Sequence, residues 1–146
     1  MEIRRLTASL SVSEQLNVED IEAVTAAGFK TVICNRPDNE GEGQPVSDSI
    51  RQACEAQGVN WQYMPVNPKA ITDAQGVQFG ELLKSVETPV LAFCRTGTRC
   101  TNLWELSQAG DLSLEEILAS AKMAGYDISS ISERVNNIAD TKNTHT

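Results

Sequence analysis

The chain has 146 residues, of which 40% are hydrophobic and 22% are charged, so its composition is that of a folded domain rather than of a disordered segment. Twenty acidic residues against twelve basic ones give a net charge of −8 at pH 7, a sign that repels nucleic-acid phosphates and disfavours a general nucleic-acid-binding role. No apolar run is long enough to span a membrane and no signal peptide is visible at the start of the chain, so we expect a cytoplasmic protein without a membrane partner.

Hydrophobic periodicity, capping residues and glycines predict strands that alternate with helices. In chain order, the predicted elements are helix 18–27, strand 31–34, helix 47–57, strand 59–66, helix 73–86, strand 89–93 and helices 100–109, 114–124 and 128–139. The run 89–93 is apolar throughout, which is typical of a strand covered on both faces. The alternation predicts an α/β fold with a central, mostly parallel sheet covered by helices. We expect one domain over residues 1–139, followed by a polar tail over residues 140–146.

The cysteine and histidine content narrows the possible chemistry. None of the four cysteines stands in a C-x-x-C pair, and the only histidine, His145, lies in the polar tail. Zinc sites are usually built from closely spaced Cys or His pairs, so we expect no metal and no cofactor. A histidine near a frayed chain end is not held against a nucleophile, so a catalytic cysteine here must be activated by other groups. Cys34 and Cys54 are expected to be core residues.

The segment 94–100 reverses the negative charge of the chain. Cys94 follows the apolar strand, at the carboxyl end where open α/β sheets bind their ligands. Gly97 permits a positive φ, so the main-chain N–H groups of the loop can converge on one point, and Arg95 and Arg99 add two positive charges. We therefore expect an anion-binding loop with Cys94 as a thiolate, since such surroundings lower a cysteine pKa to roughly 3.5–7.5. The expected anion-binding residues are Arg95, Thr96, Gly97, Thr98, Arg99 and Cys100.

The loop from Cys94 to Arg99 resembles the Cys-Arg-x-Gly-x-Arg loop of rhodanese-type sulfurtransferases and the phosphate loop of tyrosine and dual-specificity phosphatases. Further matches to one bacterial family lie along the chain, at residues 31–38, 44–45, 65–66, 89–91, 103–104 and 124–127. Together, residues 2–135 resemble the phosphatase-like domain that is found alone or fused to β-lactamase-like hydrolases, a family described as phosphatases and sometimes as sulfur transferases. The resemblance implies a tyrosine-phosphatase-like α/β fold.

The resemblance implies a phosphatase in which the Cys94 thiolate attacks phosphorus while Arg99 and the loop N–H groups hold the phosphate oxygens. Arg99 stands five residues after the cysteine instead of the usual six, and Phe93 replaces the usual histidine. In the resembled superfamily an aspartate of a neighbouring loop is the general acid, and the candidates here are Asp38 and Asp73. Their structural alternatives are a turn after a proline for Asp38 and a charge at a helix start for Asp73.

Two other functions remain open. A rhodanese-like sulfurtransferase would carry a persulfide on Cys94, and this fits the short loop and the lack of an obvious acid. A non-catalytic anion-binding or redox-sensing module would instead join Cys94 to Cys100 in a disulfide. In each case the expected partner is a small anionic or phosphorylated molecule.

Overall fold

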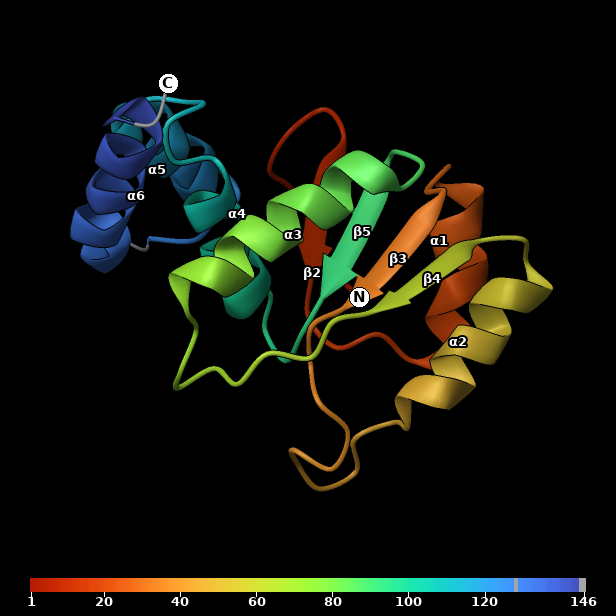
Figure 1. The fold of residues 1–146 in the computed structure, drawn as a ribbon. Helices are drawn as coiled ribbons and strands as arrows, with labels where there is room; N and C mark the ends of the chain where they lie inside the picture. The colour runs from red at the N-terminus through yellow and green to blue at the C-terminus, as the bar shows by residue number, and fades with distance from the viewer. Residues whose placement is uncertain (128, 145–146) are drawn as a thin grey trace.

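The computed structural model describes residues 1–127 and 129–144, which fold around a five-stranded sheet (Figure 1). The strands are β1 (Ile3–Arg5), β2 (Leu10–Ser13), β3 (Thr31–Cys34), β4 (Asn60–Tyr63) and β5 (Val90–Phe93). Their order across the sheet is β1-β2-β5-β3-β4; β1 pairs antiparallel with β2, and the other three pairings are parallel. The expected α/β class with a mostly parallel sheet is therefore confirmed.

Helices cover both faces of the sheet. They are α1 (Ile21–Ala26), α2 (Ser47–Ala56), α3 (Asp73–Ser85), α4 (Thr98–Ser107), α5 (Leu114–Met123) and α6 (Ser132–Thr144), with short 3₁₀ helices at Val18–Asp20 and Ser129–Ile131. Figure 1 shows α1 and α2 on one face and α3 to α6 on the other. Within the described residues, no helix combines the length and the apolar character that crossing a membrane requires.

Strand β5 contributes to the core on both faces of the sheet. Leu91 and Phe93 pack in the cluster beneath α1 and α2, whereas Val90, Ala92 and the following Cys94 pack in the cluster beneath the other helices. Successive side chains of a strand point to opposite faces, so both alternating sets must be apolar when both faces are covered. This is the physical reason for the continuous apolar run in the sequence.

Most predicted elements are present, although some of their ends differ. Strand β3 has its predicted range, and Thr72 caps α3, since its Oγ1 accepts a 3.1 Å hydrogen bond from the N–H of Gln75. Helix α4 begins at Thr98 rather than at residue 100. Strand β4 is shorter than the predicted range 59–66, because the pairing with β3 covers four residues.

Two parts of the chain differ from the prediction in kind. Strands β1 and β2 are absent from the predicted elements, and β2 is fully buried although two of its four residues are serines. The last helix ends at Thr144 rather than at residue 139, so residues 140–144 of the expected tail continue α6. His145 lies outside the described residues.

The loops after β3, β4 and β5 gather at the carboxyl ends of these three neighbouring strands, at the lower edge of the sheet in Figure 1. Asn35 ties them together. Its N–H donates to the carbonyl of Phe93 at 2.9 Å, and its side-chain amide donates to the carbonyl of Met64 at 2.9 Å. Its own carbonyl accepts from the N–H of Val66 at 3.0 Å. Cys94 follows β5 at this edge, so its surroundings are supplied by all three loops.

Candidate active site

The loop between β5 and α4 turns sharply at Gly97. This residue has a φ of 91°, in the left-handed region that favours glycine. A Cβ here would collide with the hydroxyl of Tyr126, which donates a 3.0 Å hydrogen bond to the carbonyl of Thr96. The N–H of Gln15, just after β2, donates to the carbonyl of Arg95 at 3.3 Å. Two distant parts of the chain therefore hold the loop in one shape.

The sulfur of Cys94 lies inside this turn. Cys94 is 1% exposed, and its Sγ accepts a 3.1 Å hydrogen bond from the N–H of Gly97. A hydrogen bond from the thiol of Cys100 is the largest cause of a lowered pKa, burial opposes it, and the main-chain N–H groups of Cys100, Thr96 and Gly97 lower the pKa further. Together these effects bring the pKa of Cys94 to about 6, so the thiolate predominates at pH 7.

The pKa values of the other three cysteines are raised rather than lowered. Burial, followed by the hydrogen bond to Cys94, raises the pKa of Cys100 well above its usual value, so this thiol stays protonated and can donate. Burial is also the main reason that the pKa is raised to about 12 for Cys34 and about 11 for Cys54. Both of these side chains are buried, as expected for core residues, and all four cysteines are free. Cys94 is therefore the activated thiol of the chain.

Arg99 is buried, and its guanidinium is held from several sides. Nη2 donates to Oε1 of Glu40 at 2.8 Å and Nη1 donates to Oε2 at 3.1 Å, which makes a two-point ion pair. Nη1 also donates to the carbonyls of Asn35 at 3.2 Å and Val66 at 3.0 Å. Arg36 adds a 3.1 Å ion pair from its Nε to Oε1 of Glu40. The hydrogen bond from Arg99 is the largest cause of a lowered pKa for the Glu40 carboxyl, which therefore stays ionised.

One donor of Arg99 is left over. Its Nε is buried and has no hydrogen-bond partner within the described ranges. A buried donor without an acceptor is costly, and such groups often mark sites that an ion or ligand completes. Arg99 also lines the same cavity as Cys94.

The cavity over the loop has a volume of about 630 Å³. Its walls come from the loops after β3, β4 and β5 and from α4, and the lining residues are Glu40, Asn67, Pro68, Lys69, Ile71, Cys94, Arg95, Thr96, Thr98, Arg99 and Asn102. Four of the expected anion-binding residues are among them. The other two, Gly97 and Cys100, are not lining residues and contact the sulfur of Cys94 through hydrogen bonds.

Glu40, Lys69 and Asn102 line the cavity but are absent from the predicted site residues. Glu40 and Lys69 lie in the loops that follow β3 and β4. The one signal in the sequence for these loops is that they follow predicted parallel strands, whose carboxyl ends usually carry the ligand site. Asn102 lies one turn after Thr98 on α4, and its Oδ1 is buried without a partner in the described part of the chain.

The two candidate general acids lie elsewhere. Asp38 accepts hydrogen bonds from the N–H of Ser47 at 2.8 Å and from its hydroxyl at 2.7 Å, so it holds the start of α2. Asp73 lies in the first turn of α3 and accepts from Nε and Nη2 of Arg134 at 3.0 and 2.7 Å. Neither aspartate is a lining residue of the cavity over Cys94. Across residues 1–127 and 129–144, no three His, Cys, Asp or Glu side chains are grouped so that they could hold a metal ion.

Comparison with known proteins finds relatives that match most of this chain. The family described as "Beta-lactamase hydrolase-like protein, phosphatase-like domain" matches residues 2–111. A β-lactamase hydrolase-like protein from Agrobacterium fabrum is 32% identical over 130 residues, which make up 88% of this chain. The chain spans about 30% of the length of that relative. The family resemblance expected from the sequence is confirmed.

Solved structures share the fold. A Neisseria meningitidis protein described as a candidate phosphatase superposes with a TM-score of 0.85 at 39% identity, over 94% of this chain and 99% of that one. TpbA from P. aeruginosa in complex with pTyr gives a TM-score of 0.70 at 16% identity, over 95% of this chain and 88% of that one, and this likeness shows the fold alone. None of these three proteins is described as a sulfurtransferase, so that alternative receives no support from them.

Proposed function

Because this chain belongs to the family of phosphatase-like domains of β-lactamase hydrolase-like proteins, we propose that it is a cysteine-dependent phosphatase that hydrolyses phosphate esters through Cys94. One observation carries the proposal. A buried thiol with a pKa of about 6 lines the same cavity as Arg99, an arginine that is fixed by Glu40 and still has an unpaired Nε N–H. The thiolate is the nucleophile, and the arginine and the loop N–H groups are donors for the phosphate that it attacks.

The proposed reaction has two displacements. The thiolate of Cys94 forms an S–P bond while the P–O bond to the leaving group breaks, and the leaving oxygen departs with the electron pair and takes a proton from water. A second water then attacks phosphorus, the S–P bond breaks, and inorganic phosphate and the thiolate are released. Arg95 and Lys69, which also line the cavity, add positive charge that attracts an anionic substrate in an otherwise acidic protein.

The leaving group limits the proposed substrates. Among the described lining residues the one carboxyl group is that of Glu40, and it is ionised, so it does not protonate the leaving oxygen. Without a general acid, the reaction favours leaving groups that are themselves acidic. Phenols leave more readily than alkyl alcohols, so we propose aryl phosphates as the substrate class.

The test is hydrolysis of p-nitrophenyl phosphate by the purified chain. Cys94→Ser should lower kcat at least about a thousandfold, since a serine hydroxyl lacks the ionised nucleophile, and orthovanadate should inhibit the parent. The matched control is Cys54→Ala, which removes a buried thiol on α2 and should retain turnover. Equal turnover by the parent and Cys94→Ser would rule out the proposed nucleophile.

We further propose that the protein acts in the cytoplasm on a phosphorylated small molecule or a phosphorylated aromatic side chain. All four cysteines are free thiols, and free thiols persist in reducing compartments. A thiolate nucleophile depends on such conditions, because oxidation removes it.

A further inference from the structure

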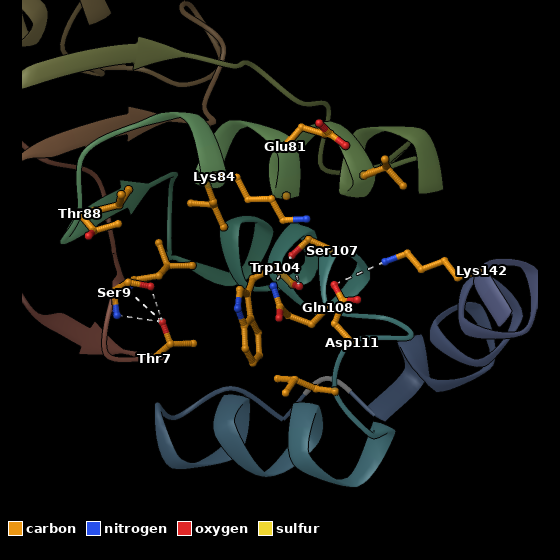
Figure 2. A pocket seen from close by; sticks show the side chains of 16 residues that line it. Thr7, Ser9, Glu81, Lys84, Thr88, Trp104, Ser107, Gln108, Asp111 and Lys142 are labelled. Carbon is orange, nitrogen blue, oxygen red and sulfur yellow. Dashed lines mark hydrogen bonds and ion pairs between the residues drawn. The ribbon is translucent and has the colours of Figure 1, made fainter. Parts of the chain in front are cut away.

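A second cavity, shown in Figure 2, lies at the end of the sheet opposite to Cys94, as its lining residues indicate. Its volume is about 600 Å³, within the range of small-molecule sites. Leu10 and Val90, which are paired residues at the starts of β2 and β5, line it, whereas Cys94 follows the other end of β5. None of its described lining residues also lines the cavity over Cys94. The two cavities are therefore separate sites.

The close packing of α3 on α4 forms one side of this cavity. A Cβ on Gly76 would collide with the side chain of Leu106, and a Cβ on Gly80 would lie 3.1 Å from the Cβ of Ser107. The two helices therefore approach closely at these glycines. One turn further along α3, Lys84 extends over the cavity toward Ser107 (Figure 2).

Trp104 contributes an unpaired donor to the cavity. It is 1% exposed, and no hydrogen bond among the described residues uses its indole N–H. The indole nitrogen is not one of the fully buried polar atoms that lack a partner in the described residues, so its N–H is accessible from the cavity and can donate to a ligand there. The ammonium of Lys84 points into the same space and makes no ion pair with a described residue.

The carboxylates that line the cavity neither accept a hydrogen bond from the Trp104 N–H nor pair with the Lys84 ammonium. Asp111 is paired with Lys142 at 3.8 Å. Glu81 also lines the cavity, and its side chain points away from Trp104 (Figure 2). The rest of the wall includes apolar side chains, namely Leu10, Val77, Leu83, Val90 and Leu112. One positive charge and one neutral donor thus stand beside an apolar surface.

We propose that this cavity binds a small carboxylate with an apolar body, of the size of a medium-chain aliphatic acid. The carboxylate accepts the indole N–H of Trp104 and pairs with the ammonium of Lys84, and the hydrocarbon chain packs against Leu83 and Leu112. Neither contact involves Cys94, so the failure of this proposal would leave the proposed phosphatase activity unaffected, and the reverse also holds.

The test uses the full chain carrying Trp61→Phe, so that Trp104 is the one remaining tryptophan. Octanoate should change the Trp104 emission with a saturable dependence on concentration. Lys84→Met should weaken octanoate binding about fivefold, which is the scale of one exposed charge pair, and leave the binding of octan-1-ol unchanged. The matched control Lys122→Met removes an exposed lysine of α5 outside both cavities and should change neither affinity.

A second variant tests the location of the ligand. Ser9→Phe places a large side chain at an exposed position of the cavity edge and should abolish the response to both octanoate and octan-1-ol. The proposal is overturned if octanoate leaves the Trp104 emission unchanged, or if Lys84→Met binds octanoate as tightly as its parent. Displacement of octanoate by orthovanadate would also overturn it, because the ligand would then lie on the loop at Cys94.

Discussion

Cys94 owes its lowered pKa to neighbours that carry no full charge. The largest contribution is the hydrogen bond from the Cys100 thiol, and the guanidinium of Arg99 is engaged with Glu40. The loop itself could be predicted from the sequence, because the apolar strand, Cys94 and Gly97 lie within one short segment of the chain. The donor role of Cys100 could not be predicted, because it depends on where the first turn of α4 places this side chain. That turn begins at residue 98, whereas the prediction began it at residue 100.

Cys100→Ala should therefore raise the pKa of Cys94. Losing one hydrogen bond to a thiolate is worth about 1.5–3 kcal/mol, which corresponds to a rise of about one to two pH units. The measurement is the rate of Cys94 alkylation by iodoacetamide against pH, whose midpoint should lie near 6 in the parent and move upward in the variant. Cys54→Ala is the matched control and should keep the parent midpoint. A midpoint that Cys100→Ala does not change would contradict the proposed donor.

At the scale of elements, the ion pair of Glu40 with Arg99 joins the loop between β3 and α2 to the start of α4. The two residues are 59 positions apart in the sequence, so no local pattern signals their pairing. The topology did place the loop after β3 beside Cys94, because β3 and β5 are neighbours. Tertiary packing decides which side chain of this acidic, glycine-containing loop reaches the arginine, and the residue of this loop predicted from the sequence, as a candidate general acid, is Asp38 and not Glu40.

Glu40→Gln should lower kcat for p-nitrophenyl phosphate about tenfold, because Arg99 is then no longer fixed by a two-point ion pair. The alkylation midpoint of Cys94 should stay near 6, since Glu40 and Arg99 are not the groups that lower its pKa. The matched control is Glu42→Gln, an exposed acid in the same loop, which should retain the parent kcat. An unchanged kcat would contradict the positioning role of Glu40. Tighter inhibition by orthovanadate would show instead that the Glu40 carboxylate obstructs the anion site.

Across the whole molecule, the parallel part of the sheet was predictable and the N-terminal hairpin was not. Strands β3 and β5 are apolar runs whose burial on both faces leaves a clear pattern in the sequence. Strand β2 has the sequence Leu-Ser-Val-Ser and is buried only because β1, β5 and the helices cover it. The alternation of apolar and polar residues is too short to identify a strand and does not show that the serines are buried, so tertiary context decides the structure.

Glu105 in α4 is a second residue whose burial could not be predicted from the local sequence. An acid in a helix is ordinarily exposed, yet Glu105 is fully buried and both of its carboxyl oxygens lack a partner within the described ranges. Burial raises the pKa of Glu105 to about 8, so the folded protein carries this group protonated at neutral pH. The unfolded chain releases the proton near the usual value of 4.5. The stability of the whole fold is therefore linked to pH through one side chain.

The contribution of Glu105 to folding stability should fall as pH rises between about 4.5 and 8, because the unfolded chain gains from ionising Glu105 while the folded chain does not. The expected loss from this group is on the order of 1.4 kcal/mol per pH unit in that window, and it ends above pH 8. Glu40 and Cys94, whose pKa values are lowered, act in the opposite sense, Glu40 at lower pH and Cys94 above about pH 6, so the loss from Glu105 is measured as the difference between the parent and Glu105→Gln. Urea unfolding at pH 5 and pH 8 tests the assignment: Glu105→Gln should be more stable than its parent at pH 8, by a margin that shrinks by a few kcal/mol at pH 5. Glu115→Gln, an exposed acid on α5, should follow the parent at both pH values, and a margin for Glu105→Gln that is the same at pH 5 and pH 8 would mean that Glu105 is ionised in the fold.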